Sequence, residues 1–227
     1  MSWSGKLLSS GNNAKTVKGD GTEYITAIMY LTPWKSAGIN VCPSAKLAGC
    51  IEGCLYTAGR GAMSNVQKAR QRKTEWWATD KAGFIYQLHQ DIRSFKKYCS
   101  KKGAKPVVRL NGTSDIRWET EAPSLLSTHD DVQFYDYTKI SNRRNLPKNY
   151  HLTWSYSGAN ERYMKQMPKH INMAVVFRDK DSIPPTFFGL ETIDGDKDDL
   201  RFLDPPDKVV ALYAKGRAKH DTSGFVV

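Results

Sequence analysis

The sequence lacks the motifs that mark the commonest enzyme classes, and it lacks any membrane-spanning stretch. It contains no Gly-x-Ser-x-Gly elbow, no His-Glu-x-x-His pair, no phosphate-binding loop and no dinucleotide glycine fingerprint, and its five histidines stand singly. No apolar run approaches the roughly 18 residues that a membrane span needs, and residues 1–6 lack the apolar core of a signal peptide. We therefore expect a cytoplasmic protein with no membrane contact.

Material for a second domain is also lacking. The chain has 227 residues, 40% of them hydrophobic, which suffices for one substantial core. The first twenty or so residues are rich in Gly, Ser, Asn and Lys and show little apolar periodicity, so we expect a loose arm over residues 1–20. The sequence thus predicts one domain over residues 1–227.

Apolar, β-rich segments alternate with helix-length connections. Strands are predicted at residues 24–31, 105–110, 132–138, 151–156, 172–177 and 209–213, with a shorter candidate at 200–203. A helical pattern covers residues 65–101, where Gly83 could interrupt it, and a short one covers 160–169. This alternation predicts an α/β fold with a parallel sheet and right-handed crossovers. About six or seven mostly parallel strands without a dinucleotide fingerprint favour an incomplete, TIM-barrel-like (β/α) barrel.

Cysteine is scarce, and its distribution is informative. Three of the four cysteines, Cys42, Cys50 and Cys54, lie within thirteen residues of one another, in a glycine-bearing loop after the first predicted strand. In a reducing cytosol, clustered cysteines are more often metal ligands or redox groups than disulfides. The fourth, Cys99, falls near a helix end before the second strand, so we expect a buried structural thiol at the opposite edge of the sheet.

Two kinds of metal site fit three clustered thiolates. They can hold three irons of a [4Fe-4S] cluster and leave the fourth iron open. They can also fill most of a zinc shell, in which case His129, His151 or Asp115 would have to supply the fourth ligand. The cluster needs no such remote ligand, so iron-sulfur is the preferred interpretation and zinc the second.

Polar side chains follow the predicted strands. In parallel α/β proteins, function gathers where the loops after the strands converge. The ligand-binding candidates at these positions are Asn111, Ser114, Asp115, Asp136, Tyr156 and Arg178. Aspartates there could instead cap helices. So many hydrogen-bonding groups at one strand end need either a ligand or each other.

A net charge of +11 is compatible with binding a nucleic acid or another polyanion. The basic residues lie in segments that read as helix faces and helix ends, where solvated lysines are ordinary. A soluble basic surface is therefore the simpler interpretation.

Two resemblances extend this picture. A cysteine-rich loop after the first strand of an incomplete barrel resembles the radical S-adenosylmethionine (SAM) enzymes, although the spacing here is Cys-x7-Cys-x3-Cys rather than Cys-x3-Cys-x2-Cys and the glycine-rich motif that holds SAM in that family is missing. Three further segments are informative together: Cys42-Pro43-Ser44-Ala45 with Cys50 and Cys54, residues 109–115, and Asp194-Gly195-Asp196 with Asp199, Arg201 and Asp204. Through these segments the chain is similar, over most of its length, to the gene-88-like family of bacteriophage proteins. That resemblance implies a phage-encoded protein in the cytoplasm of a bacterial host.

Two functions from different classes follow. The leading hypothesis is an iron-sulfur protein whose open iron, at the barrel mouth, faces a small-molecule ligand and supports redox or radical-SAM-like chemistry. The alternative is a non-catalytic module, stapled by zinc or an iron-sulfur cluster, that binds host nucleic acid or a host protein through its basic surface.

Overall fold

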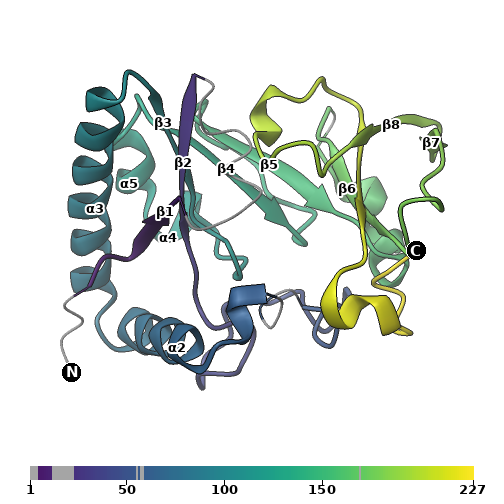
Figure 1. Cartoon of the computed structure of the whole chain (residues 1–227), viewed down its shortest axis with the longest axis horizontal. Helices are drawn as coiled ribbons and strands as arrows, with labels where there is room; N and C mark the ends of the chain where they lie inside the picture. The colour runs from purple at the N-terminus through teal and green to yellow at the C-terminus, as the bar shows by residue number, and fades with distance from the viewer. Residues whose placement is uncertain (1–4, 12–22, 55, 57–58, 169) are drawn as a thin grey trace.

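A nine-stranded sheet forms the centre of the protein in the computed structural model, which describes residues 5–11, 23–54, 56, 59–168 and 170–227 (Figure 1). Its strands are β1 (Leu8–Ser10), β2 (Tyr24–Met29), β3 (Lys105–Arg109), β4 (Gln133–Thr138), β5 (Tyr150–Ser155), β6 (Met173–Phe177), β7 (Thr186–Phe187), β8 (Leu190–Asp194) and β9 (Val209–Tyr213). They lie in the order β1-β2-β3-β4-β5-β6-β9-β8-β7. The strands from β2 to β6, with β9 and β8, pair in parallel, whereas β1 and β7 pair antiparallel with their neighbours.

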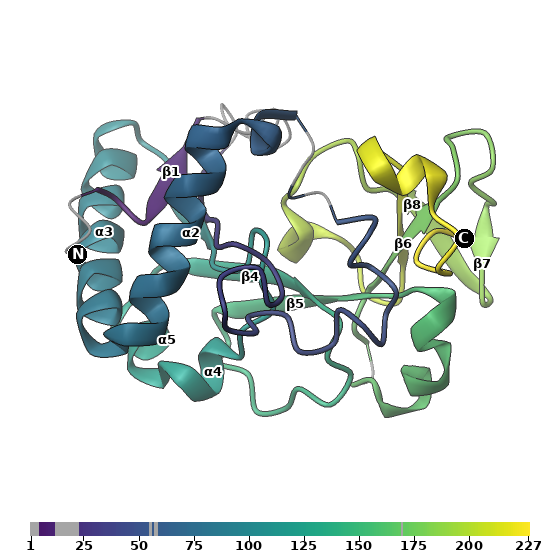
Figure 2. The same cartoon turned by 90° about the horizontal axis from the view of Figure 1, so that it is seen from below.

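Helices fill the connections between the early strands. The α-helices are α2 (Ser64–Thr79), α3 (Lys81–Lys101), α4 (Trp118–Glu121) and α5 (Pro123–Thr128), and the 3-10 helices are η2 (Gly59–Ala62), η3 (Gly158–Gln166), η4 (Arg201–Leu203) and η5 (Gly216–His220). The first two α-helices connect β2 to β3, and the other two connect β3 to β4. The parallel strands therefore end at one common edge, the carboxyl edge, which faces the viewer in Figure 2.

The sheet is open. The structure confirms a mixed α/β fold with a mostly parallel sheet. The outermost strands, β1 and β7, do not pair with each other to close the sheet, so the predicted barrel is not confirmed. The predicted strand at residues 200–203 is wrong, because the segment forms η4. The Asp198 carboxylate accepts a hydrogen bond from the Leu200 backbone N–H at 2.9 Å there, which favours a tight turn over an extended strand.

The predicted helix over residues 65–101 is two helices that meet at Asp80. The Asp80 carboxylate accepts a hydrogen bond from the Gly83 N–H at 2.9 Å, which satisfies an amide that the first turn of α3 leaves free. Gly83 therefore lies in the first turn of the second helix and does not itself break the pattern.

One face of the sheet carries the apolar core. α3 buries Phe84, Leu88 and Ile92 against β-strand side chains such as Val108 and Phe134. A second apolar cluster continues under η3 and the later strands. Burial of aliphatic and aromatic side chains at about 25 cal/mol per Å² supplies the main stabilisation of such a layer.

The opposite face of the sheet is polar. Arg109 forms an ion pair with Asp199 at 3.1 Å, and the hydroxyls of Tyr135 and Tyr137 donate to the same carboxylate at 2.7 and 3.4 Å. Next to them, η4 buries Arg201, which pairs with two neighbouring aspartates. This network fastens the segment around η4 across the sheet face that the α-helices leave uncovered.

Part of the expected loose arm is ordered. Residues 1–4 and 12–22 lie outside the described residues, but Leu8–Ser10 form strand β1. The Asp91 carboxylate of α3 accepts hydrogen bonds from the backbone N–H groups of Leu7 and Leu8, and Leu7 is fully buried. Within the described residues, no helix combines the length and the apolar character needed to cross a membrane.

Candidate metal centre at the carboxyl edge of the sheet

The cysteine loop leaves the end of β2 and lies along the carboxyl edge. In the view from below (Figure 2), this dark blue loop passes over the ends of β4 and β5. It is tied to the loop after β3 because the Asp115 N–H donates to the Val41 carbonyl at 2.8 Å and the Cys42 thiol donates to the Thr113 carbonyl at 3.6 Å. The two loops therefore form one surface.

The segment after β9 holds the other side of the loop. The Ser223 side-chain oxygen lies 2.6 Å from the Gly49 carbonyl oxygen. Gly53 lies against Phe225 so closely that a Cβ at this position would come within 2.9 Å of the Phe225 ring. Cys50 also packs against the apolar cluster of that segment. The loop thus lies between the ends of the parallel strands and the segment that follows β9.

Burial keeps the three thiols of the loop protonated when no metal is bound. It raises the pKa of Cys42 to about 12, and neighbouring Asp115 and the other two thiols push in the same direction. Burial is also the main cause that raises the pKa of Cys50 and of Cys54. Each thiolate disfavours the next, so three thiolates can coexist here only with a compensating positive charge.

Two cationic side chains stand beside the thiols. Lys139 follows β4, and its charge lowers the pKa of Cys50, whereas burial lowers the pKa of Lys139 itself to about 8. Its ammonium group donates to the Tyr156 carbonyl at 3.3 Å. The guanidinium of Arg70 in α2 lowers the pKa of Cys54 in the same way. Both cations offset negative charge at the loop.

The thiols do not form a mononuclear site in the arrangement seen. Among the described residues, no three His, Cys, Asp or Glu side chains converge closely enough to bind one metal ion. His129 precedes β4 and His151 is the second residue of β5, so both lie toward the amino edge, away from the loop.

Asp115 is committed to other partners. One carboxylate oxygen accepts from the Thr138 hydroxyl at 2.8 Å, and the other accepts from the Lys139 backbone N–H at 2.8 Å. Arg143 adds an ion pair at 3.7 Å. The carboxylate therefore positions the residues after β4 and is poorly placed to become a fourth metal ligand.

The polar residues after β3 bond to one another. The Asn111 side-chain oxygen accepts from the Ser114 hydroxyl at 2.8 Å and from the Trp118 indole at 3.2 Å. Asp136 accepts from the Asn111 N–H at 2.7 Å, and the Tyr150 hydroxyl donates to it at 2.7 Å. Burial raises the pKa of Asp136 to about 7. Of the six predicted ligand-binding residues, the structure brings Asn111, Ser114 and Asp136 together in this way, and Asp115 is joined to them through Arg143, which contacts both Asp115 and Tyr150.

The other two predicted residues lie further along the same edge. The Tyr156 hydroxyl donates to Glu161 at 2.8 Å, and the Arg178 guanidinium donates to two backbone carbonyls of the last segment at 3.1 and 3.2 Å. Cys99 is fully buried in the core at the last turn of α3, away from the cysteine loop, as expected.

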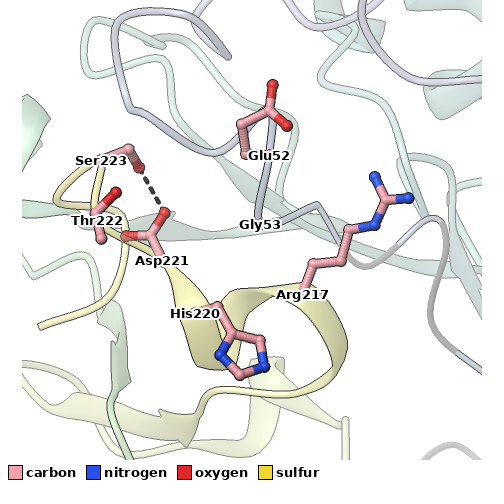
Figure 3. A pocket seen from close by; sticks show the side chains of 7 residues that line it. All are labelled: Glu52, Gly53, Arg217, His220, Asp221, Thr222 and Ser223. Carbon is pink, nitrogen blue, oxygen red and sulfur yellow. Dashed lines mark hydrogen bonds between the residues drawn. The ribbon is translucent and has the colours of Figure 1, made fainter.

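A pocket of about 300 Å³ opens between the cysteine loop and the segment after β9 (Figure 3). It is lined by Glu52, Gly53, Arg217, His220, Asp221, Thr222 and Ser223. None of the six predicted ligand-binding residues is among them. One signal in the sequence points to this wall of the pocket: the segment after the last strand should converge on the carboxyl edge just as the earlier loops do.

Comparison with known proteins adds one finding. The model of a family described as Gene product 88 matches residues 6–227, nearly the whole chain. No curated protein and no solved structure matches. The comparisons thus support the resemblance to the gene-88-like phage family and give no support to the resemblance to radical SAM enzymes.

Proposed function

The chain belongs to the Gene product 88 family, and we propose that it is an iron-sulfur protein whose Cys42, Cys50 and Cys54 hold a [4Fe-4S] cluster. The observation that carries the proposal is three half-buried thiols in one loop, at the edge where parallel strands end, with cations beside two of them. When bound, such a cluster supplies electron transfer or an iron that is free to take a ligand.

The residues around the loop suit that role. A cubane with three thiolates carries net negative charge, and Lys139 and Arg70 are placed to offset it. The apolar contacts of Cys50 with the last segment would shield that part of the cluster from water. Lys139 is buried enough to have a pKa of about 8, so it can also give up a proton near neutral pH.

We infer that the sheet is an unrolled form of the (β/α) barrel, because β2 to β6 follow one another in space without the reversal that defines a doubly wound sheet. In that arrangement the carboxyl edge is the functional one, and the cysteine loop lies on it.

Anaerobic purification tests the proposal. We expect brown protein with about four irons and four sulfides per chain. Single Cys→Ser changes at positions 42, 50 and 54 should deplete the cluster, and the matched control Cys99→Ala should keep it. EPR of the reduced protein with and without SAM tests whether the open iron takes that cofactor. Stoichiometric zinc without acid-labile sulfide would contradict the proposal.

A second function rests on α3. Arg93, Lys97 and Lys101 are exposed and four residues apart, so they form one basic stripe with exposed Tyr98 beside it. Such a stripe suits a nucleic-acid backbone. Salt-sensitive DNA retention by cluster-free protein, lost when the three cations are changed to Gln, would favour this function. Equal retention by that variant and the parent would count against it.

A further inference from the structure

The pocket beside the cysteine loop has two walls of different origin. Glu52 and Gly53 belong to the loop between Cys50 and Cys54, whereas Arg217 and His220 belong to η5. At about 300 Å³ the pocket is at the lower end of the range for small-molecule sites, which suits a ligand of amino-acid size better than a nucleotide.

The charged groups of the pocket divide into committed and free ones. Asp221 is committed, because its two oxygens accept hydrogen bonds from the Ser223 hydroxyl at 2.6 Å and the Val226 N–H at 3.1 Å. Glu52 and Arg217 are free: in the described part of the chain neither makes an ion pair or a hydrogen bond, with each other or with a third group. Figure 3 shows the Glu52 side chain rising from the cysteine loop, with its carboxylate turned away from His220 and Asp221, and the Arg217 side chain extending from η5.

A ligand that placed a negative group against Glu52 or a positive group against Arg217 would bind poorly. A simple anion would meet Arg217 and also the carboxylates of Glu52 and Asp221, and a simple cation would meet the Arg217 guanidinium. A ligand that carries both an ammonium and a carboxylate group complements the two walls together.

We propose that this pocket binds the zwitterionic head of a small α-amino acid, with the ligand carboxylate on Arg217 and its ammonium group on Glu52. The Thr222 hydroxyl and the His220 ring lie where they can contact the rest of the ligand. That this amino acid is what the cluster acts on rests on the proposed function, but its binding does not require the cluster.

Thermal-shift measurements on the full chain test the inference. An equimolar mixture of the twenty L-amino acids at millimolar concentration should raise the melting temperature, and separate additions should identify the amino acid that does so. Its amide, which lacks the carboxylate, and its N-acetyl derivative, which lacks the ammonium group, should bind about tenfold to a hundredfold more weakly. Arg217→Gln and Glu52→Gln should weaken binding by a similar factor.

Controls separate this inference from others. Lys219→Gln removes an exposed cation from the same η5 helix but outside the pocket, and should bind as the parent does. The inference is overturned if no amino acid binds, or if inorganic phosphate or succinate binds instead and Glu52→Gln tightens that binding. Iron measured in the same samples keeps the two proposals apart: iron without amino-acid binding defeats this one alone, and binding without iron defeats only the cluster.

Discussion

Thiol reactivity of the metal-free protein gives a direct test of the environment derived for the cysteine loop. The useful variant is Cys50→Ser with Cys54→Ser, because Cys42 is then the one thiol that is not fully buried among the four cysteines of the chain. Burial is the largest cause of the raised Cys42 pKa, so removal of the two neighbouring thiols should leave most of the shift in place.

The expected rate follows from the pKa of about 12. At pH 8 only about one Cys42 in 10,000 is a thiolate, against about a quarter of a free cysteine of pKa near 8.5, a deficit of roughly 2,000-fold. A more basic thiolate is intrinsically the better nucleophile, and with a Brønsted slope of about 0.45 this returns roughly 40-fold. Cys42 should therefore react about 60-fold more slowly than free cysteine.

The assay is reaction with 5,5′-dithiobis(2-nitrobenzoate) at pH 8 under pseudo-first-order conditions. The folded double variant should react at the slow rate, and the same sample in urea should reach the rate of free cysteine. Iron and sulfide added to the wild-type chain should protect all three loop thiols. If folded Cys42 reacts within about tenfold of free cysteine, the desolvated loop inferred here is wrong.

Other consequences can be checked with single changes. Lys139→Met should retain less iron per chain than Lys139→Arg, because only the second keeps a cation beside Cys50; equal iron in both would remove Lys139 from the site. Gly112→Ala would place its Cβ 2.6 Å from the Met29 carbonyl oxygen, so urea unfolding should show a loss of about 1–3 kcal/mol, and an unchanged midpoint would refute the close approach. Burial lowers the pKa of His129 to about 4, below its ordinary 6.5, so the unfolded chain binds the proton more readily. The contribution of His129 to the free energy of unfolding, measured as the difference between the parent and His129→Gln, should therefore be constant above pH 6.5 and fall as the pH drops toward 4; a difference that stays flat from pH 7 to 4.5 would contradict this.

Much of the strand pattern is readable from the sequence because buried parallel strands are short apolar runs between turn residues. The strand predicted at residues 209–213 matches β9 to the residue, and that at 105–110 differs from β3 at one end. Two departures from the prediction lie beside polar contacts. η4 forms where Asp198 accepts an amide hydrogen bond, and β1 pairs with β2 next to the long-range hydrogen bonds from the Leu7 and Leu8 amides to Asp91 of α3.

The candidate site was readable in part for a related reason. Clustered cysteines are visible in sequence, and the rule that parallel strands end at one edge places Asn111 and Asp115 near them. Sequence does not say which polar groups satisfy each other. Those pairings depend on the positions of side chains from β3, β4 and β5 in one network. The contribution of the last segment is also hard to find from sequence, because Arg217 is more than 160 residues from Cys54.

The distribution of satisfied and unsatisfied polar groups separates scaffold from site. The Asn111 and Asp136 side chains meet their hydrogen bonds internally, so a ligand there would have to break existing bonds. That network instead fixes the loop after β3, and through Asp115 it holds the backbone of Lys139 in place. The other part of the same edge holds three thiols that cannot ionise together, a buried lysine beside one of them, and, at the neighbouring pocket, an exposed carboxylate and an exposed guanidinium. Ionisation of the buried thiols is costly unless a positively charged partner arrives, so the cysteine loop is where a bound metal cluster would lower that cost.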